Sequence, residues 1–226
     1  MNIINILYEN KYMGCSRNID GSTSTSFRLP NTIIYTTSGT HSTSEGVSYI
    51  QVFAIGGGGG GAGGTSITIG GCGGGASAPG VGFFDPGSFT FTIGAGGAGG
   101  ATDTNGGIGV RTDFNTSPVT TTLKGTFGAA GQAGSALIPA GGAGGTTDVG
   151  SQYTLGRESG GTVAANIAGY GGSNYFGTGG TGIRTSTTAR DGIAGSGFGS
   201  GGSGGIGVGS VGGDGAPGAV IIIEYF

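Results

Sequence analysis

The feature that most constrains this chain is a field of glycine that runs from Gly56 to Gly218. It holds 57 of the 61 glycines in 163 of the 226 positions, about a third of the field, whereas ordinary proteins carry roughly 7% glycine. Two apolar segments with strong β propensity flank it, residues 47–55 and 219–226. A stable fold must therefore order a long segment that has almost no side chains to bury, and it must do so between two β-forming ends.

Several backbone arrangements could order such a field. A disordered low-complexity chain is one interpretation, since glycine loses more entropy on folding than any other residue, but the β-forming flanks argue against it. Collagen is excluded because glycine does not keep a three-residue period through the field. Buried amides must be paired, which leaves extended strands, turns with positive φ, and polyproline-II helices packed side by side, where the missing Cβ lets neighbours bond amide to carbonyl. The sequence leaves these three open.

The residues with side chains indicate β structure. In 47–55 both alternating faces are mostly apolar, which predicts a central strand, and Ser88–Ile93 alternates phenylalanine with threonine. Shorter strands are expected at 32–36, 65–69, 109–114, 119–123, 136–138, 153–155 and 163–167. Residues 38–46 and 70–82 are expected to be turn and loop. No helical period is present, so the expected fold is all-β with almost no helix: a glycine-rich β-sandwich, jelly-roll-like, with long glycine-rich loops and room for polyproline-II-like segments.

The N-terminal 31 residues are expected to form a separate element. Ile4, Ile6 and Tyr8 share one face of a period-2 pattern, which predicts a strand. It could pair within its own domain or add to the sheet edge of a neighbouring copy, and these three residues are therefore candidates for assembly. The predicted organisation is an arm at 1–31, for docking or assembly, followed by one glycine-rich β domain at 32–226.

Composition limits the partners. Only 8% of residues are charged and the net charge is −3, which favours packing against other protein. The basic residues are scattered, so we expect no nucleic-acid binding. The sequence has neither a secretion-signal pattern at its start nor a membrane-spanning apolar run. Cys15 and Cys72 are two buried or free thiols, or they form one pair, and their spacing does not indicate zinc.

No pattern in the sequence indicates catalysis. Residues 94–99 match G-x-G-x-x-G, but no helix is predicted after them, and in a field this rich in glycine the match arises by chance. His41 is the only histidine, and it falls in the predicted turn at 38–46, where we expect a solvated loop residue. The carboxylates are isolated in sequence. We therefore expect a protein that is not an enzyme and that has no cofactor and no metal.

Aromatic residues inside the glycine field have two interpretations. They are packing anchors between glycine-rich layers, or they form a recognition surface, because aromatic side chains beside serine, glycine and asparagine are typical of paratopes. The candidates for receptor binding are Tyr153, Tyr170, Asn174, Tyr175, Phe176 and Phe198.

Three segments in order carry a family resemblance. Residues 36–61, 89–100 and 212–225 resemble the opening, middle and closing strands of the glycine-rich domain of bacteriophage tail-fibre and related virion proteins, over roughly residues 32–226. The resemblance implies a β-sandwich-like body, closed by pairing of the first and last strands, with glycine-rich loops that project from it. A weaker resemblance is to phage adhesins that carry a sandwich of polyglycine-II helices.

The resemblance also implies a function. We expect a non-enzymatic structural or adhesive protein of a virion or extracellular fibre, located on the virion surface or outside the cell. Its partners would be copies of itself in an oligomer or polymer, other virion or fibre proteins, and a host surface glycan or protein. The alternative is a self-assembling extracellular filament subunit whose N-terminal strand is donated to a neighbouring copy.

Overall fold

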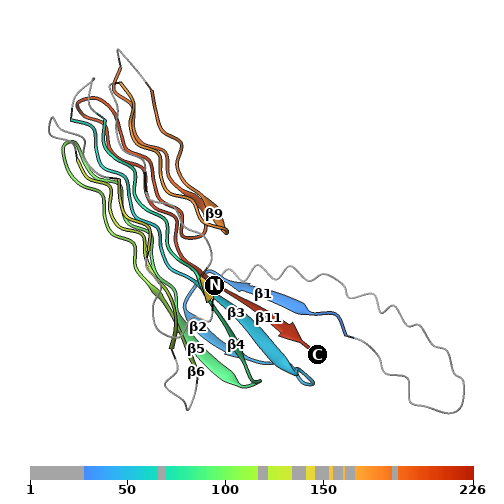
Figure 1. Cartoon of the computed structure of the whole chain (residues 1–226). Helices are drawn as coiled ribbons and strands as arrows, with labels where there is room; N and C mark the ends of the chain where they lie inside the picture. The colour runs from blue at the N-terminus through green and yellow to red at the C-terminus, as the bar shows by residue number, and fades with distance from the viewer. Residues whose placement is uncertain are drawn as a thin grey trace, which may run out of the picture.

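The computed structural model describes residues 28–65, 70–116, 122–133, 141–145, 153–154, 160, 166–184 and 188–226. A β-sandwich occupies one end of the molecule, and extended glycine-rich segments run side by side away from it (Figure 1). The described residues contain no helix. Outside them lie the arm residues Ile4, Ile6 and Tyr8, Cys15, most of the predicted strand at 65–69, and all of that at 136–138.

The first sheet has the order β1–β11–β3–β4–β8 and is antiparallel throughout. Its strands are β1 (Asn31–Tyr35), β11 (Ala219–Tyr225), β3 (Tyr49–Ile55), β4 (Gly80–Phe84) and β8 (Tyr153–Thr154). The last strand, β11, lies between β1 and β3, with Ala219 opposite Ile55. The pairing of the first and last strands and the central position of 47–55 are therefore confirmed.

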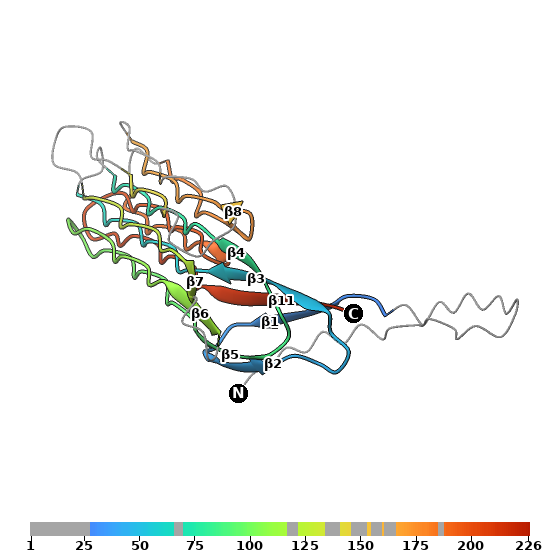
Figure 2. The ribbon, with the colours of Figure 1, turned by 60° about the horizontal axis from the view of Figure 1, so that its bottom comes forward.

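The second sheet packs against the inner face of the first (Figure 2). It has the order β2–β5–β6–β7, formed by β2 (Gly39–Ser42), β5 (Ser88–Thr92), β6 (Thr112–Thr116) and β7 (Thr122–Gly125). Ile50, Val52 and Ile222 of the first sheet meet Phe114 and Leu123 of the second in one buried cluster. These side chains supply the hydrophobic core that the glycine field cannot provide, and the expected all-β sandwich is confirmed.

Two predicted loops contain strands. The 38–46 segment includes β2, and the 70–82 segment ends in β4. In β4, a Cβ at Gly80 would collide with the backbone carbonyl of Lys124 in the opposite sheet, and a Cβ at Gly82 would lie 2.9 Å from the ring of Phe84. These glycines therefore make room for the backbone of β7 and for the ring of Phe84, which packs against the core, and their low β propensity hides the strand in the sequence.

The glycine field folds as polyproline-II-like segments packed side by side. Residues 56–64 show the rule: every third amide donates to the same neighbour. The amides thus form three series with a period of three residues. The first series donates to carbonyls of residues 104–110, the second to carbonyls of 210–216 and the third to carbonyls of 72–75, at 2.8–3.3 Å. Its carbonyls accept with the same period from residues 97–100, 128–131 and 202–205. Three residues per turn and hydrogen bonds only between segments are the geometry of polyproline II. Of the three arrangements that the sequence left open, the glycine field therefore adopts packed polyproline-II helices.

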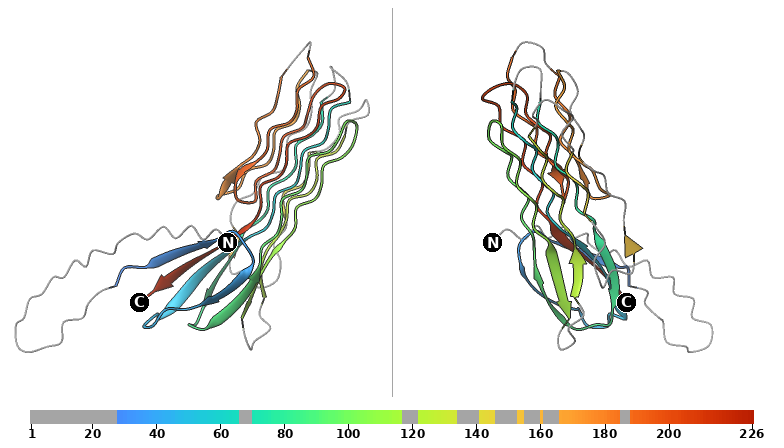
Figure 3. Two further views of the ribbon diagram at one scale, coloured as in Figure 1. Left: turned by 180° about the vertical axis from the view of Figure 1, so that it is seen from behind. Right: turned by 60° about the vertical axis from the view of Figure 1, so that its left-hand side comes forward.

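Three such segments are interior. Residues 56–64, 71–78 and 199–206 adjoin one another, and within the described residues each is surrounded by six neighbours. The surrounding segments are 94–101, 104–111, 126–133, 141–145, 168–172, 179–183, 190–195 and 210–218, together with Gly160. We call this bundle the glycine lattice; Figure 3 shows it from two further sides.

Close approach of backbones explains why the lattice needs glycine. A Cβ built on Gly57, Gly58 or Gly60 would lie 1.9–2.0 Å from a neighbouring carbonyl oxygen. Side chains are placed instead on outward positions of the surrounding segments. In 94–100, Gly94, Gly97 and Gly100 are buried, while the alanines between them are exposed. The G-x-G-x-x-G match is therefore part of this lattice.

Thr112 joins the lattice to the sandwich. Its buried hydroxyl donates to the carbonyl of Ile55 at 2.6 Å and accepts the amide of Gly94 at 3.0 Å. Ile55 ends β3 just before the first interior segment, and Gly94 begins the third segment of the field. One side chain thus fixes two of the points at which the chain leaves the sandwich.

Candidate functional site

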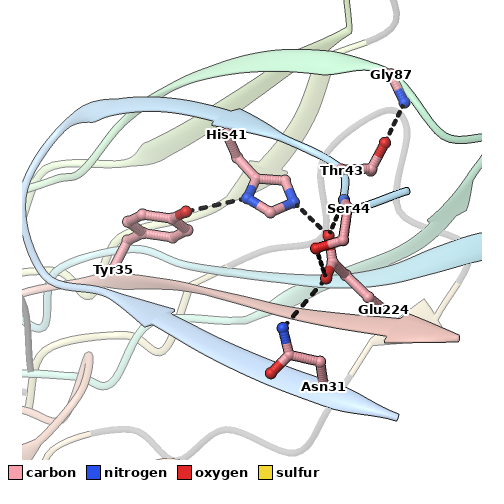
Figure 4. Close-up of polar contacts among 7 residues, drawn as sticks. All are labelled: Asn31, Tyr35, His41, Thr43, Ser44, Gly87 and Glu224. Carbon is pink, nitrogen blue, oxygen red and sulfur yellow. Dashed lines mark hydrogen bonds and ion pairs between the residues drawn. The ribbon is translucent and has the colours of Figure 1, made fainter. Parts of the chain in front are cut away.

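The most concentrated polar cluster in the described residues lies inside the sandwich. Glu224, in β11, is fully buried, and it accepts hydrogen bonds from the Ser44 amide and hydroxyl at 2.9 and 2.8 Å and from the Asn31 side chain at 3.2 Å (Figure 4). Nε2 of His41, in β2, lies 3.3 Å from Glu224 Oε1, although its geometry is not that of a well-aligned hydrogen bond. The Tyr35 hydroxyl lies 3.0 Å from His41 Nδ1.

His41 is therefore not a solvated loop residue, and that prediction was wrong. It is a strand residue with 5% of its surface exposed. The serine and threonine residues around it are typical of turns, but its ring is buried beside the carboxylate of Glu224, 183 positions later in the chain. A signal for this was present: Glu224 stands alone in an otherwise apolar central strand, and a buried carboxylate needs a partner.

Burial and hydrogen bonds set the protonation of this cluster. Burial lowers the pKa of His41, although the Glu224 carboxylate opposes this. Burial raises the pKa of Glu224, but hydrogen bonds from Ser44 and Asn31 and the nearby imidazole outweigh it, so the net shift is downward. Burial and then the Glu224 charge raise the pKa of Tyr35. At neutral pH the cluster thus holds a neutral imidazole, a carboxylate and a protonated phenol.

This arrangement is suited to holding the two sheets together. The Tyr35 phenol, whose pKa is raised, stays protonated and hydrogen-bonded to the imidazole, so it is a poor nucleophile. The cluster ties β1, β2, β11 and the turn after β2 to one carboxylate. The turn after β2 is also bonded to the turn between β4 and β5, because Thr43 and Gly87 exchange hydrogen bonds of 3.0 and 3.1 Å. Because the pKa values of His41 and Glu224 lie below those of the unfolded chain, their contribution to stability is present at neutral pH and is lost as the pH falls.

The far end of the glycine lattice is the other candidate site. Turns that link neighbouring segments gather there, at 101–104 and 206–210 among the described residues, and Arg184 and Arg190 belong to the same end through bridges to Ile167 and Ile206. Val208 is 69% exposed between two glycines with positive φ, Gly207 and Gly209. A small cluster of Ala168, Ile183 and Ile206 packs beneath them.

The six aromatic and asparagine candidates are not gathered at that end, and most of them lie beside the sandwich. Phe176 and Phe198 pack against Ile55, Ala219 and Ile221 on the outer face of the first sheet, beside the short hairpin of β9 (Gly177–Thr178) and β10 (Ser196–Gly197). The Asn174 amide approaches Ser77. Tyr175 and Tyr170 are 79% and 55% exposed. Tyr153 lies in β8, and only its backbone is described.

Comparison with known families gives one match. The model of a glycine-rich domain family matches residues 36–225, which include the second sheet, every strand of the first sheet except β1, and the whole lattice. The chain belongs to this family. No curated protein matches it significantly.

Two further properties of this glycine-rich domain follow from the described residues. They contain no group of three or more histidine, cysteine, aspartate or glutamate side chains placed to hold a metal ion. No helix among them has the length and hydrophobicity to cross a bilayer.

Proposed function

We propose that this glycine-rich domain is a non-enzymatic adhesive protein of a virion or extracellular fibre, similar to the glycine-rich domains of phage tail fibres, and that it attaches to a host surface through the turns at the far end of its lattice. It would act on the virion surface or outside the cell, in an oligomer and beside other fibre proteins. The observation that carries the proposal is the gathering of turns at the lattice end remote from the sandwich.

The physical support is preorganisation. Interior segments bonded on six sides fix where each turn begins and ends, so little entropy is lost when the turns meet a surface. The turns can differ in sequence without disturbing the lattice, because their side chains project beyond it. The exposed Val208, Arg184 and Arg190 offer both apolar and cationic contacts there.

Attachment is tested with labelled protein on a panel of bacterial cells. We expect saturable binding to some strains, and a clear loss of binding for the double variant Val208→Ser with Arg184→Ala. The matched control is Tyr175→Ala, which removes an exposed aromatic side chain near the sandwich and should bind as the wild type does. Equal binding by the double variant would contradict attachment through the far turns.

Electron microscopy of the full-length protein separates the adhesive role from the filament alternative. Discrete monomers or small oligomers are expected. Long uniform fibres that disappear when residues 1–14 are deleted would overturn the proposal in favour of a filament built by strand donation.

A further inference from the structure

The outer face of the first sheet is divided into two halves. Near the lattice, Phe176 and Phe198 cover Phe53, Ile55 and Ile221. Toward the other end, aromatic side chains from three adjacent strands remain open. Phe83 of β4 is 40% exposed and Tyr49 of β3 is 42% exposed, and the ring of Tyr225 of β11 stacks on that of Tyr49 at 4.6 Å and 11°.

The open half serves no packing role in the sandwich. Its residues alternate along the strands with Ile50, Val52 and Ile222, which point to the buried core. Single exposed apolar residues are ordinary, but a row of rings across three strands is a contiguous patch of the kind that marks a binding surface. The chain covers one half of the face with its own hairpin and leaves this half uncovered by any described residue.

Polar groups stand beside the rings. Tyr49 and Phe83 line an open hollow together with Phe84 and Asp85, and the Asp85 carboxylate is exposed at the turn after β4. Next to it, the Tyr225 hydroxyl donates to the Gln51 side-chain oxygen at 3.1 Å, which fixes that amide so that its NH₂ group is the donor. The hollow therefore combines ring surface with a carboxylate acceptor, none of its lining residues is a cation, and the Gln51 amide donor lies beside it on the same face.

We propose that this hollow is a binding site for a neutral saccharide. Sugar rings present C–H faces that pack on aromatic surface, and their hydroxyls both donate and accept, so Asp85 and Gln51 can each be satisfied. A purely apolar partner would leave the carboxylate and the amide unpaired, which is costly. An anionic polymer would be repelled by Asp85, with no cation in the lining to compensate.

The site is tested on purified full-length protein with soluble neutral hexasaccharides of glucose, galactose, mannose and N-acetylglucosamine, by saturation-transfer NMR and calorimetry. At least one should bind at millimolar or lower concentration. Tyr49→Ala with Phe83→Ala should weaken binding about tenfold or more, and Asp85→Asn should weaken it less. Tyr49→Phe, which keeps the ring, should retain most of the affinity.

The control is Tyr175→Ala, an exposed aromatic outside the hollow, which should leave saccharide affinity unchanged. Thermal unfolding must show that the double variant keeps its fold, as expected for side chains on an outer face. The proposal is overturned if no hexasaccharide binds, or if binding persists in the double variant. It is also overturned if sedimentation shows a wild-type dimer that the double variant loses, because the patch would then be an interface between copies. Failure of cell attachment through the far turns would not affect these results.

Discussion

Substitution of Gly60 by alanine tests the lattice most directly. A Cβ at this position would lie 2.0 Å from the carbonyl oxygen of Ala98, and ordinary contact begins near 3.4 Å. The segment 94–101 would therefore have to move away by roughly 1.4 Å, and overpacking of this kind costs about 1–3 kcal/mol. The move would also break the bonds that Gly97 and Gly100 donate to residues 58 and 61, both 2.8 Å long.

Each of these two broken hydrogen bonds adds about 1–3 kcal/mol, so Gly60→Ala should lower the free energy of unfolding by about 3–9 kcal/mol. That is comparable with the whole stability of a domain, about 5–15 kcal/mol. Urea unfolding followed by circular dichroism measures it. The matched control is Gly39→Ala, where the new Cβ would lie 3.7 Å from Phe91 and the change should stay within about 1 kcal/mol. If Gly60→Ala also stayed within about 1 kcal/mol, the close-packed lattice would be refuted.

Three further outcomes can be measured by the same unfolding assay. Thr112→Val should destabilise by about 2–6 kcal/mol because it leaves two buried backbone groups unpaired, whereas Thr112→Ser keeps the hydroxyl and should recover most of the loss; equal losses would contradict this. Phe176→Ala should lower the free energy of unfolding by about 1–3 kcal/mol through lost packing, whereas Tyr175→Ala should change it by no more than about 0.5 kcal/mol. A larger loss for Tyr175→Ala than for Phe176→Ala would show that the exposed ring is the one that stabilises the fold. Stability should fall as the pH drops below about 6.5, since the unfolded chain takes up a proton that buried His41 resists, and fall again below about 4.3 through Glu224. His41→Gln should remove the upper part of this decline, and an unchanged profile would count against the cluster.

The strands of the sandwich could be predicted because their side chains carry the pattern. Phe89 and Phe91 alternate with threonines in β5 and point into the core, and β3 is apolar on both faces because it lies inside a sheet. Where glycine replaces those side chains, as in β4, the pattern vanishes although the strand remains. Period-2 reasoning therefore found the strands that supply core atoms and missed one that makes room for them.

The candidate sites were harder to predict for two different reasons. His41 lies in a short polar segment, and its burial depends on Glu224 at the opposite end of the chain, so no local window contains the cause. The aromatic residues of the glycine field share one composition but have different surroundings. Phe176 packs on the first sheet, whereas Tyr175, the residue before it, is exposed. Composition identifies a candidate side chain, but the register of the segment decides which way it points.

The lattice shows why the period of the glycine field was hidden. A surrounding segment such as 94–100 has an outward position at every third residue, and alanines there reveal the period. The interior segment 56–61 has neighbours on all sides and consists of glycine alone, so no period can be seen there, although the interior segment 199–206 accommodates the buried side chains of Ser200 and Ser203. On this argument, alanine at outward positions also limits the lattice, because a Cβ there keeps another backbone from approaching closely enough to bond. The same residues that reveal the period define where the bundle ends.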